Sequence, residues 1–239
     1  MTIAIFGSPY PEHFSKYIQH LIKKLETEHI NLIIEEEFSI FLENNIRFNK
    51  SISTFNSYET LKNKADFLLS IGGDGTLLKA VTYVRESEIP IMGINTGRLG
   101  FISSISADQI DDAITDILKG NYKINERTLL ELSSDKNLFK EKNFALNEVA
   151  VSKKDTSSMI RIDAYVDDEF LNTYWADGLV VSTPTGSTGY SLSCGGPIIM
   201  PGTNNIIITP NAPHNLNVRP IVIDDNSVVK LKVEDRDQL

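Results

Sequence analysis

Short apolar runs alternate with amphipathic stretches through the first 120 residues, and this alternation limits the fold more than any other feature. The runs that predict buried strands are 2–6, 31–35, 66–71 and 90–95. The stretches whose apolar residues recur at helical spacing are 13–29, 76–85 and 106–119. Because strands that alternate with helices build parallel sheets, we expect an α/β domain, a parallel sheet with flanking helices. The mostly polar segment 43–64 predicts a loop or a mobile flap.

The sequence changes character after Gly120, a residue that also serves as a helix stop signal. Turn-like stretches then separate short runs rich in Val, Ile, Leu and aromatic residues. These runs are 127–133, 144–152, 159–167, 169–176, 178–182, 206–210, 220–223 and 228–233. A short helix is indicated near 187–194. We therefore predict an α/β domain over 1–120, followed by a β-rich C-terminal domain over 121–239.

Composition excludes several classes of protein. Lys and Arg number 23 against 32 Asp and Glu, a net charge of −9, which argues against binding nucleic acid or an anionic membrane through bulk charge. The single cysteine, Cys194, excludes an internal disulfide and a cysteine zinc cage. No apolar run reaches the roughly 18 residues of a membrane span, and the first residues do not resemble a secretory signal. We expect a cytoplasmic protein.

The strongest local signal is the sequence GGDGT at 72–76, between an apolar run and an expected helix. Glycines allow close backbone approach, and successive N–H groups at a helix N-terminus bind anions, so Gly72, Gly73, Gly75 and Thr76 suit a phosphate. Asp74 would repel a phosphate. It would instead accept a proton from an attacking hydroxyl or hold a metal that bridges phosphates. The structural alternative is a tight turn whose aspartate caps the helix.

Two further segments are weaker by themselves. The glycine-rich segment 93–101 again follows an expected strand, where Arg98 could pair with a phosphate and Phe101 could stack on a ring. A solvated arginine and a core phenylalanine are the simpler alternatives. The pair Asn147 and Glu148 suits ribose hydroxyls and a base edge, although an ordinary strand position facing water would look the same.

The last segment, 177–193, is crowded with hydroxyl and turn residues. Pro184 favours an extended Thr183, and Gly186 and Gly189 allow the backbone to bend close to a partner. Ordering such a loop costs conformational entropy, which favours a binding role over a plain surface turn. Tyr190 is either a platform for ring stacking or a residue at the rim.

Taken together, these segments resemble the NAD kinase family. That family joins a GGDGT turn, an NTGxLGF loop, an asparagine–glutamate pair and a DG…STPTGSTxYS loop, in the order found here at 72–76, 95–101, 147–148 and 177–191. The resemblance implies an α/β domain, a β-rich domain, and transfer of a phosphoryl group from ATP to the adenosine-ribose 2′-hydroxyl of NAD. It also implies a divalent metal, with Mg²⁺ expected, and a homodimer or homotetramer.

The resemblance assigns roles to individual residues. Asp74 would activate the 2′-hydroxyl. Asp177, in the dinucleotide-binding loop of the β-rich domain, would contact the nicotinamide side of NAD. The pair Asn147 and Glu148 would hold adenine or ribose groups. The remaining residues implied to bind substrate are Gly72, Gly73, Gly75, Thr76, Lys79, Phe101, Thr188, Gly189, Tyr190, Ser191, Leu192, Ser193 and Ala212.

One position departs from the family, and two other functions stay open. Many members carry a basic residue two positions before the Asp177-Gly178 pair, where this chain has Trp175. A lipid or sugar kinase could share the Gly-Gly-Asp-Gly turn, although no apolar or basic membrane-facing stretch is evident. A non-catalytic sensor would bind NAD and leave ATP unchanged.

Overall fold

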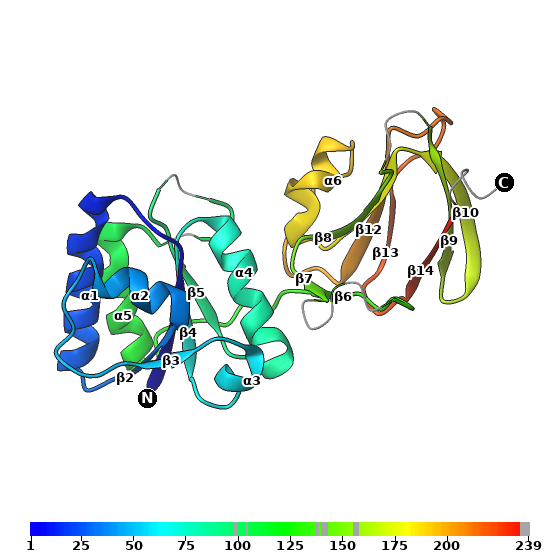
Figure 1. Ribbon diagram of the computed structural model, residues 1–239. Helices are drawn as coiled ribbons and strands as arrows, with labels where there is room; N and C mark the ends of the chain where they lie inside the picture. Colours follow the sequence, from blue (N-terminus) through cyan, green and yellow to red (C-terminus); the bar gives the residue numbers. More distant parts are fainter. Residues whose placement is uncertain (98–99, 104, 137–138, 140–142, 155–157, 235–239) are drawn as a thin grey trace. The chain divides into compact units, whose positions relative to one another are not determined.

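A five-stranded parallel sheet forms the centre of the first of two units into which the chain divides, Met1–Ile124 and Asn125–Leu239 (Figure 1). The computed structural model describes residues 1–97, 100–103, 105–136, 139, 143–154 and 158–234. The strands of unit 1 are β1 (Thr2–Gly7), β2 (Asn31–Glu35), β3 (Ser53–Phe55), β4 (Phe67–Ile71) and β5 (Ile91–Ile94). Its helices are α1 (Ser15–Thr27), α2 (Glu36–Glu43), α3 (Tyr58–Leu61), α4 (Asp74–Val84) and α5 (Ile110–Lys119).

The strand order β3-β2-β1-β4-β5 places β1 in the middle of the sheet. Alternate residues of β1 serve opposite faces, as expected for a strand buried on both sides. Ile3 and Ile5 belong to one apolar cluster, with buried residues of α1, α2 and α5. Ala4 and Phe6 belong to a second cluster, with buried residues of α3 and α4. The sheet of unit 1 is thus covered by helices on both faces.

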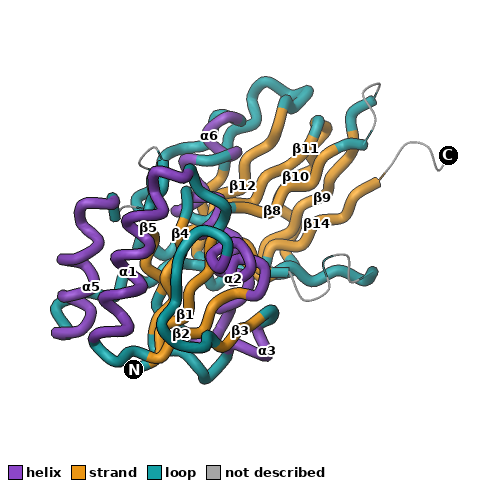
Figure 2. Tube along the Cα trace, turned by 60° about the vertical axis from the view of Figure 1, so that its left-hand side comes forward, coloured by secondary structure: helices purple, strands orange, loops and turns teal. Residues whose placement is uncertain are grey.

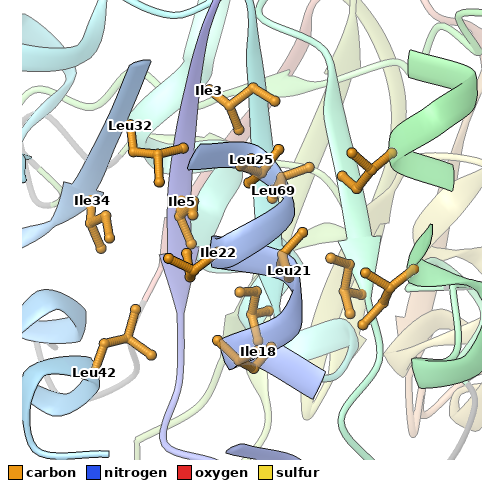
Figure 3. Close-up of a cluster of buried hydrophobic side chains, with 14 of the residues drawn as sticks. Ile3, Ile5, Ile18, Leu21, Ile22, Leu25, Leu32, Ile34, Leu42 and Leu69 are labelled. Carbon is orange, nitrogen blue, oxygen red and sulfur yellow. The ribbon is translucent and has the colours of Figure 1, made fainter. Parts of the chain in front are cut away.

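Helix α1 supplies much of the larger cluster. Figure 3 shows Ile18, Leu21, Ile22 and Leu25 gathered against the strands, and all four side chains are fully buried. Their spacing is the i, i+3, i+4, i+7 pattern of one helical face. The helix confirms the amphipathic segment predicted from the sequence, with its ends moved inward to Ser15 and Thr27.

The prediction of a loop over 43–64 is wrong, because this segment contains β3 and α3. Strand β3 pairs in parallel with β2, and Glu35 lies opposite Phe55. Only Phe55 of its three residues is buried, at 2% exposure, so an edge strand with one core side chain gives no apolar run to detect. Helix α2 was also not predicted; the Glu35 carboxylate accepts a hydrogen bond from Phe38 N at its start.

Unit 2 is rich in strands, which Figure 2 draws in orange, and they pair antiparallel. Its strands are β6 (Leu130–Glu131), β7 (Phe144–Ala145), β8 (Glu148–Ser152), β9 (Ile160–Val166), β10 (Glu169–Ala176), β11 (Gly178–Ser182), β12 (Asn205–Asn211), β13 (Ile221–Asp224) and β14 (Val229–Glu234). The sheets β10-β9-β14 and β13-β12-β11-β8 share one core that includes Ile162, Tyr174, Leu179 and Ile208. The predicted fold class, an α/β unit followed by a β-rich unit, is confirmed.

No helix within the described ranges is long and apolar enough to cross a membrane.

The buried face of α1 makes a prediction about stability. Replacing Leu25 by Ala removes a fully buried side chain and should lower the free energy of unfolding by about 2–5 kcal/mol. The exposed Lys23 on the same helix is the control, and Lys23→Ala should change this free energy by less than about 0.5 kcal/mol. Urea unfolding followed by far-UV circular dichroism measures both, and equal effects would contradict the assignment of the buried face.

Candidate functional site

The glycine turn of unit 1, residues 72–76, follows β4 at the carboxyl edge of the sheet. Strands β2 and β3 lie on one side of β1, and β4 and β5 lie on the other. The loops after β1 and β4 meet there: Ser8 N donates to Ile71 O at 3.1 Å, and the Ser8 and Thr76 hydroxyls lie 3.0 Å apart. Parallel sheets bind ligands at such a switch point. Ser8 had not been singled out in the sequence, because its role depends on strand order.

The three glycines of the turn differ in backbone conformation and in the space around them. Gly72 has a φ of +152°, and a Cβ at this position would overlap the Thr76 side chain. Gly73 and Gly75 are exposed, and a Cβ built on either would meet nothing within 4 Å. Since the first N–H groups of a helix have no intrahelical partner, this open surface at the start of α4 suits an anion.

Helix α4 begins at Asp74, two residues earlier than predicted, with Gly73 as its N-cap. No side chain caps this helix, so Asp74 does not act as the helix cap considered in the sequence. Its carboxylate instead accepts three backbone N–H groups from the next loop. Phe101 N donates to Oδ2 at 2.8 Å, whereas Ile102 N and Ser103 N donate to Oδ1 at 3.2 and 2.9 Å.

The structure therefore brings the first two motifs together within unit 1. Phe101 is 82% exposed and is not a core residue, which leaves its ring free to stack on a ligand. Lys79 is exposed on α4, whereas Thr76 is buried and its hydroxyl is engaged with Ser8. Arg98 lies outside the described residues.

A separate cavity of about 500 Å³ lies in unit 1 and has no motif residue in its lining. It is lined in part by Thr2, Asn31 and Ser53, the first residues of β1, β2 and β3. These residues mark the amino edge of the parallel sheet. The candidate site is identified by the chemistry of the carboxyl edge, and not by this cavity.

In unit 2, the pair Asn147 and Glu148 lies at the start of β8 and carries unsatisfied buried atoms. Asn147 Oδ1 and Glu148 Oε2 are buried without a hydrogen-bond partner among the described residues, as is Ser182 Oγ. Ser182 lies directly opposite Glu148 in the pairing of β8 with β11. Buried polar atoms normally have partners, so three in one place indicate donors that a ligand would supply.

Burial also changes the ionisation of this cluster. Desolvation raises the pKa of the Glu148 carboxyl, and the backbone N–H of Tyr190 opposes this shift. Desolvation likewise raises the pKa of the nearby Cys194 thiol. Burial therefore disfavours the ionised form of the Glu148 carboxyl.

The hydroxyl-rich segment folds as a short 3-10 helix (Thr185–Thr188) and helix α6 (Tyr190–Ser193). This segment packs on the pair Asn147 and Glu148: the backbone approaches so closely that a Cβ at Gly186 would overlap Asn147 O. One at Gly189 would lie 3.2 Å from Glu148 Oε2. The structure thus joins the third and fourth motifs within unit 2.

The predicted binding residues of this segment differ in accessibility. Ser191 is fully buried, and its hydroxyl lies 2.9 Å from Thr209 Oγ1, so it supports the loop from within. Tyr190, Leu192 and Ser193 are exposed, and Thr188 and Gly189 are half-buried. Asn211 Nδ2 donates to the Tyr190 hydroxyl at 2.8 Å, which restrains the ring.

Asp177 connects β10 to β11 and has a cationic partner that the sequence pattern did not reveal. Lys153 Nζ lies 2.6 Å from Asp177 Oδ1, and Lys153 N donates to Asp177 O. Asp177 N donates to Asn211 O, one residue before the exposed Ala212, whose φ is +46°. The register of β11 with β12, in which Gly178 lies opposite Asn211, places Asp177 and Ala212 at neighbouring strand ends.

The described side chains do not form a metal-binding site made of protein ligands alone. Within the part of the chain that the structure describes, no three His, Cys, Asp or Glu residues are grouped so that they could hold an ion. At the glycine turn the Asp74 carboxylate is the acidic group, and it already accepts three N–H groups.

Comparison with known proteins covers both units. The family model of the ATP-NAD kinase N-terminal domain matches residues 3–122, and that of the ATP-NAD kinase C-terminal domain matches residues 146–239. The NAD kinase of Cytophaga hutchinsonii is 48% identical over 239 residues, which cover 100% of this chain and 82% of that protein. The NAD kinase of Bacteroides fragilis is 44% identical over 236 residues, covering 99% and 81%.

Solved structures give the same fold. Yeast NADH kinase complexed with NADH superposes with a TM-score of 0.83 at 24% identity, covering 98% of this chain and 72% of that one. An NAD kinase from Archaeoglobus fulgidus in complex with ATP has a TM-score of 0.74 at 27% identity, covering 98% and 81%. With both family models matched and relatives this similar along its whole length, the chain belongs to the NAD kinase family.

Proposed function

We propose that this chain transfers the γ-phosphoryl group of ATP to the 2′-hydroxyl of the adenosine ribose of NAD, with Asp74 as the group that accepts the hydroxyl proton. Family membership across both units supports the reaction. The observation that carries the role of Asp74 is its carboxylate at the switch point of the sheet, flanked by the open glycines Gly73 and Gly75.

The first turn of α4 would bind phosphate oxygens. A Cβ built on Gly73 or Gly75 would meet nothing within 4 Å, so the surface there is open, and the positive end of the helix dipole favours an anion. In the transfer, a bond forms between the ribose 2′-oxygen and the γ-phosphorus, and the bond from that phosphorus to the leaving oxygen of ADP breaks. The hydroxyl proton passes to Asp74, and the exposed Lys79 on α4 would offset phosphate charge.

A divalent ion would enter as part of the nucleotide. Because the described residues form no three-ligand cage, Mg²⁺ bound to the phosphates of ATP is the form that fits this chain. Such an ion neutralises charge on the phosphates. The Mg²⁺ preference and a homodimer or homotetramer stay predictions from the family resemblance, and a cytoplasmic location stays a prediction from the sequence.

Unit 2 would hold the dinucleotide. The buried acceptors Asn147 Oδ1 and Glu148 Oε2 lack donors, and ribose hydroxyls and the adenine amino group would supply them. Tyr190, exposed and restrained by Asn211, would stack on a ring, while Thr188, Gly189, Leu192 and Ser193 would line the same surface. Asp177, paired with Lys153, and Ala212 would contact the nicotinamide side.

The central test is product formation. The full chain with NAD, ATP and Mg²⁺ should produce NADP, detected with an NADP-specific dehydrogenase. Asp74→Asn should lower the rate by about 10²–10⁴-fold, because it removes the proton acceptor. The exposed Asp116 of α5 is the control, and Asp116→Asn should keep the wild-type rate.

The outcomes separate the alternatives. Near-normal turnover by Asp74→Asn at unchanged stability would remove Asp74 from the mechanism. NAD binding by the wild type without consumption of ATP would favour the sensor, and ATP consumption with a lipid or sugar but not with NAD would favour the other kinases.

Glu148 makes a prediction about pH. Burial raises the pKa of the Glu148 carboxyl in the folded state. Its contribution to folding stability is therefore fully present below the ordinary pKa of the unfolded chain, and is lost as pH rises through the pKa of the folded state. At pH 7 the buried charge costs stability, so Glu148→Gln should raise the Tm. Near pH 4 the Glu148 carboxyl of the wild type is protonated and therefore neutral, like the amide of Gln, and the difference in Tm between the two proteins should vanish.

The matched control is Glu169, exposed at the start of β10, where substitution by Gln should leave the Tm unaltered at both pH values. If Glu148 also binds substrate, saturating NAD should raise the Tm of the wild type more than that of Glu148→Gln. A variant stabilised equally at pH 4 and pH 7 would refute the assigned cost of ionisation.

A further inference from the structure

The loop that contains residues 100–103 holds the Asp74 carboxylate with main-chain groups alone. We call the N–H groups of Phe101, Ile102 and Ser103 the amide clamp. Their distances to the carboxylate oxygens are 2.8, 3.2 and 2.9 Å, and both oxygens are engaged. Because the donors belong to the backbone, no side-chain pattern in the sequence indicates them.

Three donors leave the carboxylate little freedom. An ionised carboxylate has about four lone-pair positions on its two oxygens. The amide clamp uses three, so roughly one remains for an incoming hydroxyl proton. The clamp therefore selects the direction from which Asp74 can accept a hydrogen bond, and charge-assisted bonds of this kind hold that geometry firmly.

Gly100 makes this contact sterically possible. A Cβ at Gly100 would overlap Asp74 Oδ1 and Cγ, and would lie 2.6 Å from Oδ2. The φ of Gly100 is not in the left-handed region, so its backbone conformation does not itself require glycine. Glycine is needed at this position for space against the carboxylate.

The clamp is anchored to the sheet as well as to Asp74. Ser103 Oγ donates to Gly72 O at 3.2 Å, and Asn95 Nδ2 donates to Ser103 O at 3.3 Å. A Cβ at Gly93 of β5 would lie 2.8 Å from Ser103 Cα, so this glycine allows the loop to approach the sheet. The loop is fixed against β4 and β5 at one end and presents the exposed Phe101 ring at the other.

We propose that residues 100–103 are a positioning element for phosphoryl transfer, in which the amide clamp aims the Asp74 carboxylate and Gly100 provides the space for it. The proposal rests on the proposed function, since it concerns how Asp74 meets the reacting hydroxyl. Phe101 contributes in two separable ways: its N–H belongs to the clamp, and its ring is available to the dinucleotide. The loop thus determines kcat through its backbone and NAD affinity through one side chain.

The kinetic test uses three variants of the full chain. Gly100→Ala forces the carboxylate and the clamp apart and should lower kcat by about 10²-fold, the order expected for a misplacement near 1 Å, with little change in KM for NAD. Gly97→Ala adds the same methyl group in the same loop, where the nearest atom is 4.0 Å away, and should keep the wild-type kcat. Phe101→Ala retains the N–H and should mainly raise KM for NAD.

A structural readout accompanies the kinetics. Gly100→Ala should lower the Tm of the wild type, but it should lower the Tm little or not at all in an Asp74→Ala background, because the atoms that it would meet are absent there. If Gly100→Ala alone did not fold, a folded double variant would support the contact in the same way.

The proposal would be overturned by a wild-type kcat in Gly100→Ala, by a loss confined to KM, or by Tm losses that add independently of Asp74. These results differ from a failure of the proposed function. A wild-type chain that makes no NADP would refute the reaction, whereas the Tm comparison would still report whether the clamp positions Asp74.

Discussion

A single carboxylate held by main-chain N–H groups is the interaction on which the chemistry proposed for unit 1 depends. Asp74 is the first residue of α4, at the positive end of its dipole, and both of its oxygens accept hydrogen bonds from the loop after β5. Backbone donors of this kind are fixed by the sheet beneath them. The arrangement therefore places an acidic group in the turn that we propose binds phosphate.

Unit 2 instead buries polar atoms that have no hydrogen-bond partner among the described residues. Asn147, Glu148 and Ser182 each leave a buried oxygen unsatisfied. Desolvation by burial raises the pKa of the Glu148 carboxyl. This cost in the free protein becomes specificity when a ligand supplies the missing donors. In the function that we propose, the acidic chain would recognise an anionic dinucleotide through local hydrogen bonds, without a basic surface.

Much of the fold could be predicted from the sequence, because period-2 and period-3.6 patterns follow directly from burial. The four predicted strands and the three long helices of unit 1 were confirmed, and the short runs of the second half contain β-strands. The prediction for 43–64 failed because β3 is an edge strand with one buried side chain, Phe55. Helix α2 was not predicted, because its start is marked by a hydrogen bond from Phe38 N to the Glu35 carboxylate, which the apolar pattern does not show.

For the site, the sequence by itself determined which residues can carry chemistry: an aspartate among glycines, an asparagine–glutamate pair and a loop rich in hydroxyls. Tertiary structure alone decided what each of them touches. It placed Ser8 beside Thr76 through strand order, Lys153 beside Asp177 through the pairing of β8 with β11, and three N–H groups on Asp74. The physical reason is that backbone donors and strand register are properties of the folded chain, and every residue type except proline carries the same N–H group.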